Sequence, residues 1–418
     1  MMPAGVTAPV EHRKALALLV AVLIVTAALL FVFLPRTLVV PTIFHPTIQS
    51  AIEDARVGDI VFVRRGYYTE LFTIDKPLSL IGENRIETVI ERPSQDRRPY
   101  AIQISADRVI VSGFTIKGGS IWVETGLDHH PTGCRIIGNN IIDGSGIVTI
   151  GGEDLTISGN NITGNLFGIS LSTSNSIISR NYVAENGHAG IAIDGCSNVT
   201  VSGNVITRNA VDEVLSDYGG LLLFRDGRFD VYGNNISGNK VGVQFGIFCS
   251  NATVHDNYVE GNEFGIMLRN YEIGENDTFG WGNVVYRNNM VGNSQNAFVD
   301  PDLLYGPVIK DSENGTDQVF WHSGGLGNYW SDFSSKHPEA MEVNGSGVWD
   351  TPYVIDANNT DPFPRVLPYE LKGPKLRQDS FPAFLQVAAV VAITAMAAVV
   401  GFILWKKRKS SVDLVKKS

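Results

Sequence analysis

The sequence predicts an all-β fold: a right-handed parallel β-helix, a solenoid with three short strands per coil. The first observation is a phrase that recurs, since CSNVTVSGN at 196–204 returns as CSNATVHDN at 249–257. The second is a series of similar segments, each closed by an asparagine, and the third is that apolar residues stand at constant offsets from that asparagine. Short β-type segments repeated about every 21–23 residues are typical of solenoids.

The closing asparagines are spaced 21, 21, 23, 30, 23 and 31 residues apart, and they are Asn139, Asn160, Asn181, Asn204, Asn234, Asn257 and Asn288. Aliphatic residues precede them by three positions and follow them by two, as in Ile157 and Ile162 around Asn160. A third segment follows, for example GISL at 168–171. Asparagine suits corners because it tolerates left-handed backbone angles, and stacked asparagines can bond to one another. We expect coils roughly 4.8 Å apart with these aliphatic residues inside.

The two ends of the solenoid need covers, because exposed sheet ends invite aggregation. Residues 45–300 are predicted as the β-helix. At its start, residues 46–56 place Ile48, Ala51, Ile52 and Ala55 on one helical face, which indicates an amphipathic cap helix. Residues 35–44 are predicted as a linker. Residues 301–372 lose the repeat and gain aromatic residues, including Trp321, Trp330 and Trp349, so we expect a C-terminal capping module.

Two apolar runs flank the solenoid, at 15–34 and 381–405, and each is long enough to span a hydrocarbon core. Basic residues precede the first run and follow the second. The positive-inside rule then predicts a cytoplasmic N-terminus (1–14), a basic cytoplasmic tail (406–418), and a β-helix held outside the cell membrane by two transmembrane helices. The alternative for 15–34 is a cleavable signal peptide, but the run is long and lacks a closing A-x-A site.

Charge excludes one class of partner. Residues 35–380 carry a net charge of −16, so we expect no binding of nucleic acid and a solvated extracellular surface. Cys196 and Cys249 share a register but stand two coils apart, roughly 9.6 Å, which is too far for a disulfide. With Cys134 at an inward offset, the sequence predicts three free thiols.

Eight N-x-S/T sequons occur, and a repeat rich in Asn and Thr produces such matches by chance. The better candidates for glycosylation are those in predicted loops, namely Asn276, Asn314, Asn344 and Asn358.

The segment TIQSAIEDARVGDIVFVRRGYYTE (47–70), leading into LSLIGE, resembles the N-terminal part of NosD-type β-helix proteins and, more loosely, of the pectin-lyase-like superfamily. GNYWSDF (327–333) with DTPYVID (350–356) and DPFP (361–364) resembles the C-terminal signature of archaeal NosD-like surface proteins. The resemblance implies repeats of the carbohydrate-binding and sugar-hydrolase type. Relatives often carry an Asp/Gly-rich loop between these two C-terminal motifs that looks like a calcium site, whereas this chain has almost no Asp there. No cofactor is firmly implied, with Ca²⁺ as the candidate.

Two units of the repeat are longer than the others, and their extra residues lie in turns on either side of the third strand. Between these turns we expect a binding groove for an extended chain such as a glycan. Its candidate residues are Asp194, Gln244, Met267 and Arg269 on the strand face, and Asp212, Glu213, Asp217, Glu272, Glu275 and Asp277 in the turns. The alternative is that long turns in solenoids cost little and carry no function.

A metal site is the second hypothesis for a functional centre, at Asp128, His129 and His130, although adjacent residues rarely point at one ion. The preferred function is a surface protein that binds a polysaccharide or another envelope component. The alternatives are a polysaccharide lyase, hydrolase or epimerase, with catalytic residues unassigned, and an accessory protein of a membrane transporter or of metalloenzyme maturation.

Overall fold

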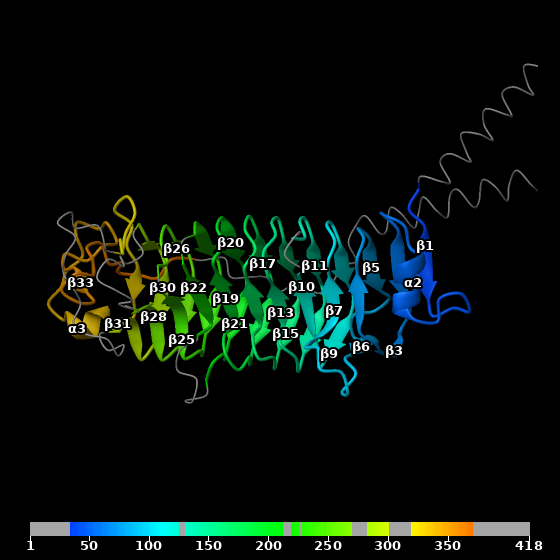
Figure 1. Ribbon diagram of the computed structural model, residues 1–418. Coiled ribbons are helices and arrows are strands. Elements are labelled where there is room, and N and C mark those ends of the chain that lie inside the picture. Colours follow the sequence, from blue (N-terminus) through cyan, green and yellow to red (C-terminus); the bar gives the residue numbers. More distant parts are fainter. Residues whose placement is uncertain are drawn as a thin grey trace, which may run out of the picture. The chain divides into compact units, whose positions relative to one another are not determined.

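The computed structural model describes residues 34–124, 130–211, 219–225, 227–246, 248–269, 282–300 and 319–370. Within them the chain winds through three sheets in turn, and every strand in these sheets pairs in parallel with the strands one coil before and after it (Figure 1). Such crossovers are right-handed in about 98% of cases. The predicted parallel β-helix with three strands per coil is confirmed.

The three sheets are named here by their strands. Sheet A contains β1 (Thr37–Val40), β2 (Ile60–Val63), β5 (Ser79–Gly82), β8 (Ile110–Ser112), β11 (Arg135–Ile137), β14 (Thr156–Ser158), β17 (Ile177–Ser179), β20 (Val199–Ser202), β23 (Phe229–Tyr232), β26 (Thr253–His255) and β29 (Val284–Tyr286). Sheet B contains β3 (Gly66–Thr69), β6 (Thr88–Glu91), β9 (Thr115–Lys117), β12 (Asn140–Ile142), β15 (Asn161–Thr163), β18 (Tyr182–Ala184), β21 (Val205–Thr207), β24 (Asn235–Ser237), β27 (Tyr258–Glu260), β30 (Asn289–Val291) and β32 (Tyr329–Trp330). Sheet C contains β4 (Phe72–Ile74), β7 (Tyr100–Ile104), β10 (Ser120–Val123), β13 (Ile147–Thr149), β16 (Ile169–Leu171), β19 (Ile191–Asp194), β22 (Leu221–Phe224), β25 (Val241–Phe245), β28 (Phe264–Arg269) and β31 (Gln295–Asp300).

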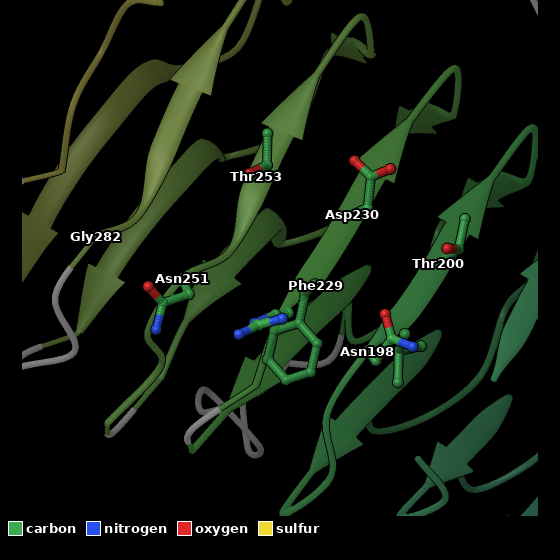
Figure 2. Close-up of a pocket in the computed structure, with 9 residues that line it drawn as sticks. Asn198, Thr200, Phe229, Asp230, Asn251, Thr253 and Gly282 are labelled. Atoms are coloured by element: carbon green, nitrogen blue, oxygen red, sulfur yellow. The ribbon is translucent and has the colours of Figure 1, made fainter. Parts of the chain in front are cut away.

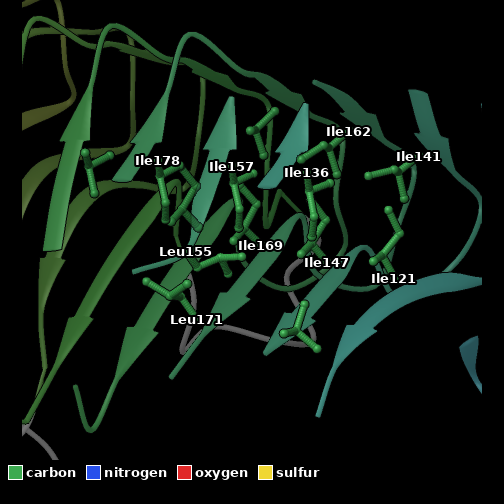
Figure 3. Close-up of a cluster of buried hydrophobic side chains, with 14 of the residues drawn as sticks. Ile121, Ile136, Ile141, Ile147, Leu155, Ile157, Ile162, Ile169, Leu171 and Ile178 are labelled. Carbon is green, nitrogen blue, oxygen red and sulfur yellow. The ribbon is translucent and has the colours of Figure 1, made fainter. Parts of the chain in front are cut away.

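The core is a column of aliphatic side chains enclosed by the three sheets (Figure 3). Ile157 of sheet A and Ile162 of sheet B are fully buried, and so are the residues at the same offsets in the other coils. Because strand side chains alternate between the two faces, every inward aliphatic residue leaves its neighbours pointing outward. Full burial of one such side chain stabilises the fold by roughly 1.5–3 kcal/mol.

The asparagines at the corners form a ladder. The side-chain oxygen of Asn160 accepts hydrogen bonds from the backbone N–H and the side-chain amide of Asn139, at 2.9 and 3.2 Å, and the same pattern repeats through Asn288. The ladder continues to Asn328 and ends on the carboxylate of Asp361. The structure adds a second ladder five residues further along each coil, made of Asn165, Asn186, Asn209, Asn239, Asn262 and Asn293.

The N-terminal end differs from the prediction in one segment. Part of the predicted linker forms β1, which pairs in parallel with β2 because its alternate residues Leu38 and Val40 are buried in the core. The predicted cap helix is α2 (Ile48–Asp54), which begins after the N-cap Thr47 in a capping box with Ser50. Its buried face consists of Ile48, Ala51 and Ile52.

The C-terminal end first completes the solenoid and then covers it. Trp330 of β32 extends sheet B and is buried, with its ring stacked on Tyr353 at a centroid distance of 4.1 Å. The short helix α3 (Phe333–Lys336) and the antiparallel pair β33 (Tyr353–Val354) and β34 (Thr360–Asp361) pack around these rings. Trp321 and Trp349 also belong to this small aromatic core, as the sequence predicts.

Among the described residues, none of the helices has the length and hydropathy needed to cross a bilayer. The predicted spans at 15–34 and 381–405 lie outside those residues except for Leu34. Both spans remain predictions.

Candidate functional site

A hollow of about 340 Å³ lies on the outward face of sheet A (Figure 2). Its floor is a row of three outward residues on successive coils, Thr200 of β20, Asp230 of β23 and Thr253 of β26, which are direct partners in the sheet register. Asn198 and Asn251 border the hollow at the corner where the chain enters the sheet. The hollow therefore presents hydroxyl, carboxylate and amide groups, together with the guanidinium group of Arg228, on a rigid surface.

The strand pattern explains this placement. In β23 the residues on either side of Asp230, Phe229 and Val231, are buried in the core, so Asp230 must point outward. Asn198 and Asn251 have φ values of 60° and 54°, the left-handed conformation that asparagine tolerates better than most residues. Their backbones turn sharply, and this turn leaves room above the strand floor.

Beside the hollow runs a strip of three rings, Tyr232, His255 and Tyr286. Tyr232 and His255 stand two residues further along β23 and β26, and Tyr286 is their register partner on the next strand, β29. Tyr232 and His255 stack with centroids 5.4 Å apart, and His255 and Tyr286 with centroids 5.1 Å apart. The stack ends at Tyr232, because its partner in the preceding coil is Ser202. A serine side chain is too short to cover a ring, and Tyr232 is 38% exposed.

Charged groups connect the hollow to the strip. His255 Nε2 lies 3.1 Å from Asp230 Oδ1, and its Nδ1 lies 2.8 Å from Asp256 Oδ2. Carboxylates only accept hydrogen bonds, so the ring satisfies both contacts when both of its nitrogens carry a proton. Arg287 donates to Asp256 from Nε at 2.8 Å, which extends the chain of charges to the next coil. Asp230 thus belongs to both the hollow and the strip.

Two tyrosines beside this network, Tyr286 and Tyr369, have raised pKa values. Burial raises the pKa of Tyr286, and the carboxylates of Asp256 and Asp230 raise it further. Burial also raises the pKa of Tyr369 to about 12, although the guanidinium groups of Arg365 and Arg287 lie over its ring. Both phenols remain hydrogen-bond donors.

The groove predicted on sheet C has a different character. Gln244 is the register partner of Leu222 and Met267, and all three point outward yet are buried. Both polar atoms of the Gln244 side chain are buried, and neither has a hydrogen-bond partner among the residues that the structure describes. Arg269 is also buried, and its Nε lies 3.6 Å from Asp300 Oδ2.

Asp194 does not share the row of Gln244 and Met267, because its register partner is Phe224. Its carboxylate lies 3.5 Å from Arg225 Nε instead. The register therefore places Gln244 and Met267 in one row with Leu222. It places Asp194 in the next outward row, with Phe224 and, three coils further on, Arg269.

The remaining predicted site residues are mostly outside the described part of the chain. These are the turn residues Asp212, Glu213, Asp217, Glu272, Glu275 and Asp277, the metal candidates Asp128 and His129, and the sequons at Asn276 and Asn314. His130 is described and exposed, as are Asn344 and Asn358. Their roles remain predictions.

The sequence carried a signal for the strip that the prediction missed. The position two residues before each marker asparagine reads Ser202, Tyr232, His255 and Tyr286 in four successive coils. Ser202 is followed at the same outward position by three aromatic side chains in successive coils, and this pattern indicates a row of stacked rings in a parallel sheet. The hollow itself gives no comparable signal, because its walls come from corner residues of three coils.

Residues 101–335 match a family model described as periplasmic copper-binding protein (NosD). Copper sites are built from grouped soft or imidazole ligands. Within the described residues, no three His, Cys, Asp or Glu side chains gather where they could hold a metal ion. Cys134, Cys196 and Cys249 are buried and form no disulfide, as predicted, and burial raises the pKa of Cys134 and Cys196 to about 11. This part of the chain does not fit copper.

Solved structures of similar fold include the A-modules of two mannuronan C-5 epimerases of Azotobacter vinelandii. The AlgE4 module has a TM-score of 0.51 and 15% identity, over 68% of this chain and 82% of that one. The AlgE6 module has a TM-score of 0.50 and 16% identity, over 68% and 81%. At this identity the likeness concerns the fold alone, and no curated protein matches the chain. Since the family model covers more than half of the sequence, the chain belongs to the NosD family of parallel β-helix proteins.

Proposed function

We propose that this protein is a membrane-held, extracytoplasmic β-helix that binds a polysaccharide or another envelope glycan on the outward face of sheet A. The observation that carries the proposal is the uncovered ring face of Tyr232 at the border between the aromatic strip and the hollow. Sugar rings pair an apolar face with a rim of hydroxyls, and this border offers a ring beside polar groups.

A sugar ring over Ser202 would contact the free face of Tyr232 and reach polar groups on the neighbouring row. Thr200 lies on the same strand as Ser202, and Asp230 on the same strand as Tyr232. A carboxylate accepts hydrogen bonds from two sugar hydroxyls at once, and such charge-assisted bonds are the stronger kind.

The row continues away from the rings with short hydroxyl side chains. Ser202 pairs with Ser179, and Ser179 pairs with Ser158, so an open polar track follows the solenoid axis. A linear polymer lying along this track would meet the same chemistry at each coil. This geometry favours an extended chain over a compact ligand.

The proposed location rests on the sequence and the family. The apolar runs at 15–34 and 381–405, with their basic flanks, support two membrane anchors and an external solenoid. The description of the family as periplasmic supports the same side of the membrane.

A panel of envelope and plant polysaccharides, read by affinity electrophoresis or calorimetry, tests the proposal. We expect Tyr232→Ala to weaken binding of the best ligand roughly tenfold, which corresponds to about 1.4 kcal/mol. The matched control is Tyr67→Ala, since Tyr67 is an exposed tyrosine on β3 of sheet B. Equal binding by the wild type and Tyr232→Ala would contradict the proposal.

A second function, modification of the glycan, is favoured by one contact. Asp230 and His255, 3.1 Å apart at the edge of the hollow, have the chemistry of a general acid and base. The same panel, read for new reducing ends, unsaturated products or inverted uronate centres, decides between the two functions. Turnover that disappears in Asp230→Asn while binding remains would establish an enzyme.

A further inference from the structure

Two large apolar side chains stand at the tip of a tight turn between β1 and α2. Ile43 is 90% exposed and Phe44 is 79% exposed, the largest exposures among the large apolar residues of the described chain. An exposed apolar residue by itself is ordinary, but two adjacent ones at the tip of a turn form a protruding apolar point.

The turn is held in shape by its own hydrogen bonds. The N–H of Thr42 donates to the carbonyl oxygen of His45 at 2.9 Å, and the N–H of His45 donates to Thr42 Oγ1 at 3.0 Å. His45 Nε2 also lies 3.3 Å from Asp54 Oδ2, which ties the turn to the end of α2. The two apolar side chains are thus presented outward on a fixed base.

The turn belongs to the N-terminal end of the solenoid. β1 is the first strand of sheet A and α2 covers the core beside it, at the blue end of the ribbon in Figure 1. Two further exposed apolar residues belong to the same first coil, Leu34 at 60% and Val57 at 69%. The end of the solenoid that follows the N-terminal apolar run therefore carries several apolar groups that the protein does not cover.

The chain itself indicates what meets this end. Only residues 35 and 36 separate the uncharged run 15–34 from β1, and Ile43 lies nine positions after Leu34. Nine residues span at most about 30 Å, so the turn stays close to wherever the apolar run leaves the bilayer. Phenylalanine and isoleucine side chains partition into the interfacial layer of a membrane, where the lipid itself can bury the two apolar residues of the turn.

We infer that Ile43 and Phe44 insert into the outer interfacial layer of the lipid bilayer and fix the N-terminal end of the solenoid against the membrane. This inference rests on the membrane anchoring proposed above. It assigns to the turn a lipid contact separate from both the glycan face and the transmembrane segments.

The test uses the full chain reconstituted in phosphatidylcholine vesicles, with Phe44→Cys labelled by an environment-sensitive fluorophore. The native thiols are 5% exposed or less, so a brief reaction labels only the introduced cysteine. The control is Ile177→Cys on β17, an exposed isoleucine in the middle of sheet A. We expect a blue-shifted emission that doxyl-labelled lipid quenches at position 44 and an aqueous, unquenched emission at position 177.

The outcomes separate the inference from the anchoring. If the chain floats with the vesicles but position 44 reads as aqueous, the lipid contact is wrong and the anchoring stands. A blue shift at position 44 that doxyl lipid does not quench indicates a protein contact and also overturns the inference. If the chain does not float with the vesicles, both proposals fail.

Discussion

The outward faces of sheets A and C, on the same coils, use opposite chemistry. On sheet A, Asp230 and His255 are partly exposed and hydrogen-bonded to each other at 3.1 Å, beside an open hollow. On sheet C, Gln244 is fully buried between Leu222 and Met267, and its amide has no hydrogen-bond partner in the described part of the chain. One face offers polar groups to solvent, and the other hides a polar group from it.

The comparison shows that pointing outward does not make a residue a surface residue. Both faces obey the same strand alternation, so the sequence places Gln244 and Asp230 alike. Only packing around the strands decides which of them a ligand can reach. For this reason we place the binding site on sheet A and treat the amide on sheet C as a cost to stability.

The largest expected effect concerns Asp59, whose carboxylate binds Arg36 and Arg56 at the N-terminal end of the solenoid, away from both faces. Burial acts to raise its pKa, but the N–H groups of Arg56 and Arg36 and the Arg36 guanidinium outweigh burial and lower the pKa below its ordinary value. A lowered pKa stabilises the fold at pH values above about 4, and this contribution is lost as pH falls through the folded pKa. We expect Asp59→Asn to cost about 2 kcal/mol at pH 7, measured by urea unfolding.

The difference in unfolding free energy between the wild type and Asp59→Asn should shrink toward zero in acid, where the wild-type carboxyl is itself protonated. Asp75→Asn is the matched control, since the Asp75 side chain is 65% exposed. A cost of Asp59→Asn that is unchanged at pH 3 would contradict the assigned role of the carboxylate.

A smaller effect of opposite sign is expected on sheet C. Gln244→Leu removes two buried polar atoms without partners and adds an apolar side chain between apolar neighbours, so it should stabilise the protein by roughly 1–2 kcal/mol. The control is Gln103→Leu on the same outward row, because Gln103 accepts a hydrogen bond from Thr73 Oγ1 at 3.1 Å. That variant should not stabilise.

The glycan affinity of Gln244→Leu tests whether the binding site is on sheet A or on sheet C. We expect binding equal to the wild type, because the proposed site lies on the other sheet. A large loss of affinity would return the site to the groove predicted from the sequence.

Substitution of Ser202 by tyrosine is expected to have the smallest effect on stability but a large effect on glycan binding. Ser202→Tyr would extend the ring stack by one coil and cover the free face of Tyr232, changing stability by less than about 1 kcal/mol. Binding should weaken about tenfold, as in Tyr232→Ala. Ser112→Tyr, at the same outward offset several coils away, should leave affinity unchanged. Retained binding by Ser202→Tyr would exclude the ring face as the contact.

Much of the fold could be predicted because each coil of a solenoid places equivalent residues in the same packing environment. Each offset from the marker asparagine fixes one environment, so Val201, Val254 and Ile157 could be placed in the core from spacing alone, and all three are fully buried. The second asparagine ladder was missed because only one asparagine per repeat served as the marker. Asn165 and its equivalents stand five residues later in the same alignment.

The candidate site was harder to predict than the core. Outward residues are free to vary between coils, so the prediction relied on the two long turns, whose acidic residues lie outside the described structure. The burial of Gln244 depends on what packs over the strand, and no periodic pattern encodes that packing. The aromatic row was readable in principle, because rings at one offset in successive coils must stack.

The ladder that ends on Asp361 has a consequence for how such chains change length. Every internal rung of the ladder joins one asparagine to another asparagine one turn away. Only the two ends differ: the N–H of Phe114 donates to Asn139 at one end, and the carboxylate of Asp361 accepts from Asn328 at the other. A whole turn can therefore be duplicated or deleted in evolution while every new neighbour is still a correct one. The length of the solenoid is then adjustable in steps of one turn, with both ends of the ladder unchanged.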